Sequence, residues 1–93
     1  MSAIEARTLD DGDPVTFDVM VRDENGETKH RVTLSRKDFE RLRNGADAAR
    51  LIEAAFRFLL DREPKESILA RFDVSVIARY FPEFELKLPE YLK

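Results

Sequence analysis

The chain has 93 residues, a formal net charge of −3, no cysteine and 43% hydrophobic residues. This length suits one hydrophobic core, so we expect a single domain over residues 1–93. The lack of cysteine excludes disulfides and thiolate metal sites, and the hydrophobic fraction is too high for a disordered chain.

No apolar run approaches the roughly 18 residues that a membrane span requires. The first residues also lack the basic start and apolar stretch of a signal peptide. We therefore expect no membrane association and a cytoplasmic location. Charge is unevenly spread, because residues 1–28 carry eight acids and two bases whereas residues 29–43 carry six bases and two acids.

The first third of the chain predicts an arm followed by a β-hairpin. Residues 1–13 show no clear periodicity and end in an acidic, turn-rich stretch, which is typical of a flexible arm. Residues 15–22 alternate between apolar and polar side chains, and residues 27–34 repeat the alternation, as half-buried strands do. The Asn-Gly pair between them is a strong hairpin signal, so residues 14–34 are predicted to form an antiparallel hairpin.

Charge favours one register for this hairpin. A two-residue turn would place Arg22 opposite Lys29, and like charges directly opposite each other are destabilising. A four-residue turn over 23–26 places Arg22 opposite Glu27 instead. Both registers keep the apolar faces together, and we predict the one with the four-residue turn.

Residues 35–82 are predicted to hold three to four helices. Ser35 and Asp47 are typical N-cap residues, and they open helices that end near Gly45 and before Pro64. The second of these helices has the clearest pattern, because its apolar residues recur at steps of three and four. These residues are Ala48, Leu51, Ile52, Ala55, Phe56 and Leu59.

Beyond Pro64 the pattern predicts two shorter helices and a tail. Pro64 suits the first turn of a third helix, whose buried side would be Ile68, Leu69 and Phe72. Asp73 is a candidate cap for a fourth helix, and Pro82 ends it. Residues 83–93 are predicted to form an extended tail, whose alternation suits a short edge strand that joins the hairpin or pairs with a second copy. The predicted fold class is α+β: an N-terminal antiparallel β-hairpin packed on three to four helices, with a possible short C-terminal edge strand.

The search for catalytic or metal-binding motifs yields no candidate. His30 is the one histidine, and it falls on the inward strand face, which favours a core-edge histidine over a general base. There is no glycine-rich phosphate loop and no nucleophile elbow. The turn at 23–26 echoes a calcium loop but lacks donors at the first and twelfth positions. We expect a non-enzymatic protein without a cofactor or metal.

Nucleic-acid binding is the alternative that the sequence leaves open. One basis is the basic patch of residues 29–43, which could contact phosphate or an acidic protein. The other is a degenerate helix-turn-helix over 65–81, in which Asp73 stands near the expected glycine and Arg79 alone offers a donor for bases. The acidic chain lacks the basic footprint of such proteins, so two helices packing their apolar sides is the preferred interpretation.

The preferred hypothesis is a non-enzymatic protein-interaction or regulatory module, with a protein partner or a second copy as its ligand. Its motivation is the number of apolar residues in the tail and the aromatic, cationic end of the last predicted helix, since Arg and Tyr are common at interface hot spots. For Tyr80 and Phe81 themselves, the favoured interpretation is that both fill the core, and a binding surface is the alternative. The candidate interaction surface consists of Arg36, Lys37, Arg41, Arg43, Arg79, Tyr80, Phe84, Leu86 and Tyr91.

Two stretches carry a resemblance to other proteins. They are Phe58–Leu69, which reads FLLDREPKESIL, and Val76–Phe84, which reads VIARYFPEF. These two stretches resemble the sequences of an uncharacterised family of small bacterial proteins. The resemblance implies a bacterial protein whose family has no assigned activity, and it implies no catalytic or ligand-binding residue.

Overall fold

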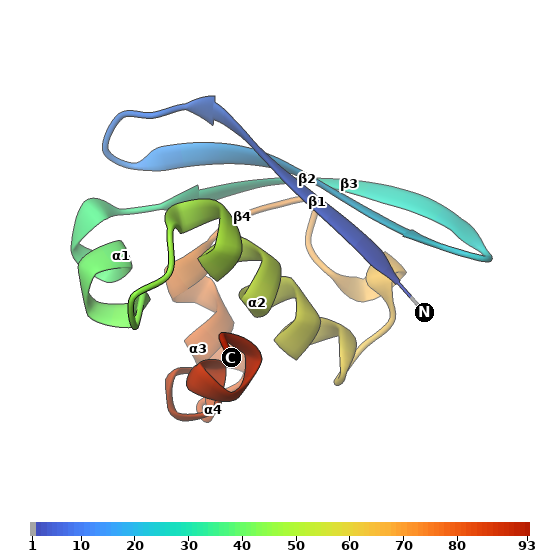
Figure 1. The fold of residues 1–93 in the computed structure, drawn as a ribbon. Helices are drawn as coiled ribbons and strands as arrows, with labels where there is room; N and C mark the ends of the chain where they lie inside the picture. The colour runs from blue at the N-terminus through green and yellow to red at the C-terminus, as the bar shows by residue number, and fades with distance from the viewer. Residues whose placement is uncertain (1) are drawn as a thin grey trace.

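The computed structural model describes residues 2–93, which form one sheet with helices packed against one of its faces (Figure 1). The strands are β1 (Ala3–Asp10), β2 (Val15–Asp23), β3 (Gly26–Leu34) and β4 (Arg71–Asp73). The α-helices are α1 (Arg36–Leu42), α2 (Ala48–Leu60), α3 (Ile77–Tyr80) and α4 (Phe84–Tyr91). Two short 3-10 helices, η1 (Lys65–Ser67) and η2 (Val74–Val76), flank β4. The α+β class and the N-terminal hairpin packed on helices are thus confirmed.

The sheet has the strand order β1-β2-β3-β4. The first three strands are antiparallel, and β4 runs parallel to β3. The hairpin has the predicted register, because Arg22 lies opposite Glu27 and their side chains form an ion pair of 3.1 Å. The register prediction, which avoided placing Arg22 opposite Lys29, therefore gave the correct turn.

The prediction of a flexible arm over residues 1–13 is wrong where the structure describes it. Residues 3–10 form β1, which pairs with the free side of β2. Ile4 and Ala6 point toward the helices and pack against the core. Alanines at positions 3 and 6 weaken the alternation of this strand, so its pattern is hard to see without the neighbouring strand.

Helices α1 and α2 begin and end close to the predicted residues. The Ser35 hydroxyl accepts a hydrogen bond of 3.0 Å from the Asp38 amide, and the Asp47 carboxylate accepts one of 2.8 Å from the Arg50 amide. After α1, Gly45 has a φ of 88°, a left-handed conformation that glycine adopts at low cost. Both predicted caps are confirmed.

The predicted third helix is wrong. Residues 65–67 make a single 3-10 turn, and β4 follows, with Phe72 opposite Val32 of β3. The free edge of β3 supplies hydrogen-bond partners to this segment; for example, the Arg31 amide donates to the Ala70 carbonyl at 2.7 Å. The degenerate helix-turn-helix over 65–81 is therefore absent, because its first helix is replaced by a strand.

The tail is a helix rather than an extended segment. Phe84 and Leu88, one turn apart in α4, are each 1% exposed, whereas Leu86 between them is 79% exposed. The four-residue spacing of the buried side chains therefore matches the helix. The same stretch also alternates between apolar and polar residues, which is why it was predicted to be extended. The short edge strand of the predicted fold exists, but Arg71–Asp73 forms it instead of the tail.

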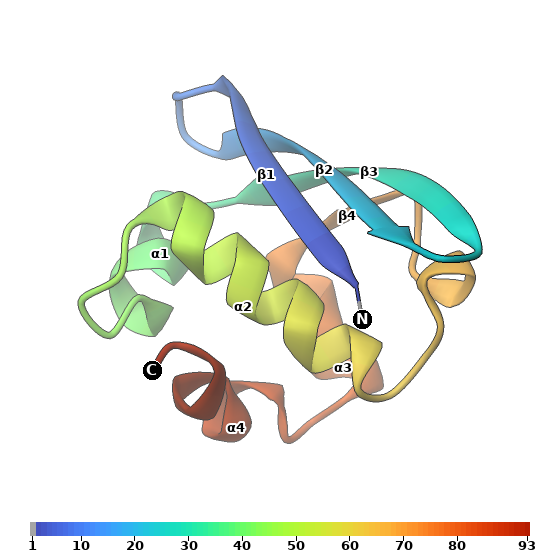
Figure 2. The same cartoon turned by 45° about the vertical axis from the view of Figure 1, so that its right-hand side comes forward.

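The hydrophobic core lies between the inner face of the sheet and α2 and continues on the other side of α2, against α3 and α4 (Figures 1 and 2). Its largest fully buried side chains are Phe17, Phe56, Phe58, Phe84, Leu34, Leu51, Ile52 and Leu88. Within residues 2–93, no helix combines the length and the apolar composition needed to cross a bilayer.

Candidate functional site

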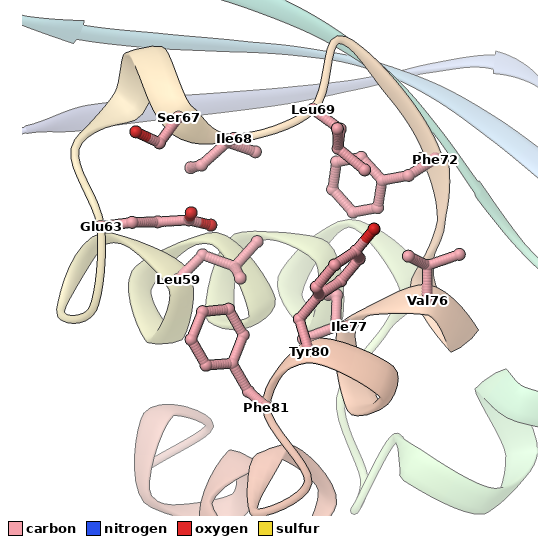
Figure 3. A pocket seen from close by; sticks show the side chains of 10 residues that line it. All are labelled: Leu59, Glu63, Ser67, Ile68, Leu69, Phe72, Val76, Ile77, Tyr80 and Phe81. Atoms are coloured by element: carbon pink, nitrogen blue, oxygen red, sulfur yellow. The ribbon is translucent and has the colours of Figure 1, made fainter.

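An apolar groove opens between the η1–β4 segment and α3, above the C-terminal end of α2 (Figure 3). Its volume is about 190 Å³. The side chains that line it are Leu59, Glu63, Ser67, Ile68, Leu69, Phe72, Val76, Ile77, Tyr80 and Phe81. We call this site the apolar groove.

Buried residues from three different segments form the inner part of the groove. Leu59 belongs to the buried stripe of α2, Ile68 follows η1, and Ile77 begins α3. All three belong to the hydrophobic core, so the groove is continuous with the interior of the protein. A side chain that entered the groove would meet a surface that is already packed.

Two exposed hydrophobic side chains stand at the rim. Leu69 is 48% exposed and Tyr80 is 68% exposed. Figure 3 shows them on opposite sides of the opening, with Tyr80 extending from α3 toward Phe72. Single exposed apolar residues are common, but exposed apolar residues gathered at a concave surface are typical of an interaction site.

The wall that carries Leu69 is held by His30. The Nδ1–H of His30 donates to the Leu69 carbonyl at 2.7 Å, and Nε2 lies 2.8 Å from the Thr28 hydroxyl. The ring also packs on Phe56, with the ring centroids 5.3 Å apart. His30 is buried, as predicted for a core-edge histidine, and it fixes the backbone at the rim of the groove.

Asp73 fixes the other end of this wall. Its carboxylate accepts hydrogen bonds from the Thr33 hydroxyl of β3 and from the Ser75 amide of η2. Burial alone would raise the pKa of Asp73, but these hydrogen bonds outweigh burial and lower it. The charged carboxylate thereby ties β4 to β3 and begins the turn that leads into α3.

Glu63 is the one acidic side chain of the groove lining. It points across the groove between Leu59 and Ile68 (Figure 3). Burial raises the pKa of its carboxyl, because a charge is poorly solvated beside apolar groups. Within residues 2–93 the carboxylate has no ion pair or hydrogen bond with another side chain, so a cation supplied from outside would stabilise it.

The size of the groove limits what it can bind. A volume of 190 Å³ lies below the roughly 300 Å³ at which small-molecule sites begin. It is comparable to the approximately 150 Å³ cavity that admits a benzene ring in a protein core. The part of the chain that the structure describes also holds no group of three or more His, Cys, Asp or Glu side chains placed to bind a metal. One aromatic or leucine-sized side chain matches the groove best.

Of the nine side chains of the predicted surface, Tyr80 alone lines the groove. Arg79 is exposed beside it, and Leu86 is exposed on α4. Phe84 is buried against Phe58, with ring centroids 5.0 Å apart, so it offers no surface. Tyr91 is half-buried and its hydroxyl donates to Asp61 at 2.5 Å, which ties α4 to the end of α2.

The basic patch of residues 29–43 is divided in space. Arg31 lies on the outer face of the sheet, whereas Arg41 pairs with Asp38 and with Glu85 on the helical side. Arg43 packs over the Phe39 ring at 4.6 Å. Arg36 and Lys37 are exposed at the start of α1. These cations do not converge on one surface.

The outer sheet face holds a different set of cations. Arg7, Arg31 and Arg71 lie in one row across the strands, with Asp18 between the first two. Together with Lys29 they line a shallow hollow of about 490 Å³. Asp18 pairs with Arg31 at 3.1 Å, so the remaining cations give this hollow a positive character despite Glu5 at its margin.

Sequence reasoning missed most of the groove because it placed Ile68, Leu69 and Phe72 on one buried helix face. The adjacent pair Ile68-Leu69 is the signal that was available. In an extended segment successive side chains point to opposite sides, so only one member of such a pair can face the core of a sheet that is covered on one face. Glu63 gave no signal, since it is one of 19 acidic residues in the chain and nothing in its local pattern sets it apart.

Comparisons of the chain with known protein families, curated proteins and solved structures find no match.

Proposed function

We propose that this protein is a non-enzymatic interaction module whose apolar groove binds one apolar side chain of a partner protein. The observation that carries the proposal is the groove itself, with buried Leu59 and Ile77 inside and exposed Leu69 and Tyr80 at its rim. Interface anchors are typically aromatic or aliphatic side chains that fill such pockets.

Glu63 narrows the chemistry of the partner. Its poorly solvated carboxylate lies in the groove with no cation opposite it within residues 2–93. A partner segment with a Lys or Arg close to its apolar anchor would supply that cation and complement the groove electrostatically. The proposed ligand is therefore a short protein segment that combines a leucine or aromatic residue with a neighbouring basic residue.

Selection from a library of displayed random peptides tests this function. The purified protein is the bait, and binders are then measured against Tyr80→Asp and against Leu86→Asp as the matched control. We expect selected peptides to share an apolar residue next to Lys or Arg. Removing an interface anchor costs about 2 kcal/mol or more, so Tyr80→Asp should weaken binding by roughly 30-fold and Leu86→Asp should not.

Two outcomes of the peptide selection would contradict docking in the groove. If no peptide is enriched, or if enriched peptides bind the Tyr80→Asp variant as well as they bind the unmodified protein, the groove is not the docking site. Peptides that lose affinity in Leu86→Asp but not in Tyr80→Asp would place the interaction on α4 instead.

Binding to nucleic-acid phosphates is a second candidate, favoured by the row of cations on the outer sheet face. Arg31 and Arg71 lie on the neighbouring strands β3 and β4, and Arg7 lies two strands from Arg31, across Asp18 of β2. Neighbouring strands are about 4.8 Å apart, so the row of cations can follow a backbone of phosphates. Within residues 2–93, the outer face carries no aromatic side chain on which bases could stack, and this ranks the candidate below the groove.

Gel shifts at about 50 mM salt with single-stranded DNA, RNA and duplex DNA decide the second candidate. Binding that is lost in the double variant Lys29→Glu/Arg71→Glu and kept in Arg57→Glu, on exposed α2 surface, would support it. Absence of binding at this low salt would reject it.

A further inference from the structure

One edge of the sheet has a long free strand. Within residues 2–93, β1 has β2 on one side and no strand on the other (Figures 1 and 2). At the opposite edge, β4 has three residues, which is the kind of short edge that proteins use to prevent pairing. The eight-residue β1 has no such protection along its regular part.

Irregularity in β1 is confined to its end. The register with β2 shifts between Thr8 and Asp10, so Leu9 forms a bulge. Ile4 to Thr8 are regular, and they present a continuous set of backbone groups at the edge. The inner-face residues Ile4 and Ala6 are half-buried, and α2 packs against β1 on this face, so a second strand would have to approach from the side of the sheet edge.

We propose that two copies of this chain pair antiparallel through β1, with the two-fold axis at Ala6. In this register Glu5 of one copy faces Arg7 of its partner, and the same pair repeats across the axis. Ala6 faces its own counterpart, and Ile4 faces Thr8. Opposite charges that face each other in neighbouring strands stabilise the pairing, and an isologous contact closes the assembly at two copies.

Neighbouring registers are disfavoured by the same two charges. An axis at Glu5 would place two glutamates opposite each other, and an axis at Arg7 would place two arginines opposite each other. An axis between two residues would set inner-face side chains against outer-face ones. The charge pattern of β1 thus selects one register, in which the sheets of the two copies become continuous.

Charge reversal tests this pairing directly. The oligomeric state of the unmodified protein, Glu5→Arg and Glu5→Arg/Arg7→Glu is measured by sedimentation over a concentration series. We expect a dimer for the unmodified protein and a dissociation constant raised roughly tenfold or more in Glu5→Arg, which opposes two pairs of arginines. The double variant restores both pairs and should recover dimerisation.

Cross-linking supplies a second measurement that does not depend on charge. The chain has no cysteine, so Ala6→Cys introduces a single thiol at the proposed axis. Mild oxidation should link two copies through it. Thr8→Cys is the matched control, because its counterpart would lie about 13 Å away along the strands.

A monomeric unmodified protein at several hundred micromolar would overturn the proposal. So would a dimer that Glu5→Arg leaves intact, or equal cross-linking of the two cysteine variants. The groove and β1 lie at opposite edges of the sheet, so either surface can fail its test without consequence for the other.

Discussion

The charge of Glu63 lowers the stability of the folded protein, and the fold does not need this charge. Its pKa is raised because its carboxylate is partly buried beside apolar side chains, so the folded protein holds this charge at some expense of stability at neutral pH. Residues of binding sites often reduce stability in this way.

The substitution Glu63→Gln should therefore raise the free energy of unfolding at pH 7. The folded pKa lies above the ordinary 4.5, so the penalty is complete above the raised pKa and disappears as pH falls below 4.5. Urea unfolding at pH 7 and pH 4 measures the difference between the variant and the unmodified protein. A difference that is equal at both pH values would contradict the assigned cause.

Lys65 illustrates a charge that the fold does compensate. Its side chain is almost fully buried, and its ammonium lies 2.8 Å from Asp23 and 2.6 Å from Glu66. Hydrogen bonds from Lys65 lower the pKa of both carboxyls, and the same bonds raise the pKa of Lys65. The contact ties η1 to the hairpin turn and so supports the segment that leads to the groove.

The stability that this cluster contributes should be lost in acid. The two carboxyl pKa values are depressed, so the contribution is complete above their ordinary values of 3.8 and 4.5 and declines as pH falls through the lowered ones. Lys65→Met should give a shallower loss of stability between pH 5 and pH 2 in denaturant titrations. Lys87→Met, at an exposed ion pair, should leave the pH dependence unchanged.

At the scale of elements, an aromatic cluster joins α2 to the C-terminal part of the chain. Phe58 is fully buried and makes edge contacts with Phe81, Phe84 and Tyr91. Arg62 covers its other side, with the guanidinium carbon 3.6 Å from the ring centroid. This cluster holds α3 and α4 in place and therefore supports the Tyr80 side of the groove.

Truncation of Phe58 should be severe. Phe58→Ala is expected to cost about 3–5 kcal/mol of unfolding free energy, as large-to-small changes of buried aromatics do. Phe58→Leu, which keeps more of the volume, should cost less. Urea denaturation measures both, and a loss below about 1 kcal/mol for Phe58→Ala would show that α4 is not held through this side chain.

Elements with strong local signals were predictable from the sequence, and elements that depend on distant partners were not. Ser35 and Asp47 mark their helices through hydrogen bonds within four residues, and the charges of Arg22 and Glu27 select the hairpin register locally. Strand β4, in contrast, exists because β3 has a free edge.

The groove was difficult to predict for the same reason. It is built from three segments, and its Leu69 wall is held by His30, which lies 39 residues away in the sequence. Tyr80 was a candidate for the interaction surface because tyrosine is common at interface hot spots, whereas Leu69 and Phe72 were assigned to the buried side of a helix. A site assembled by a parallel strand pairing leaves almost no trace in the local pattern.

At the scale of the whole molecule, the two proposed surfaces lie at opposite edges of the sheet. A dimer formed through β1 would be a continuous sheet with one apolar groove toward each end. Such an arrangement would bind a partner that carries two copies of the recognised segment with greater avidity than a single groove can provide. The distance between the grooves would then set the spacing that the partner needs.

The central claim is that partners dock in the apolar groove, and an NMR titration tests it most directly. A selected peptide is added to the ¹⁵N-labelled protein, and shifts of the amide signals are followed residue by residue. We predict that the shifts concentrate at residues 67–69 and 72–80 and leave residues 3–8 unchanged. Shifts concentrated on the outer sheet face, around Lys29 and Arg71, would contradict the claim.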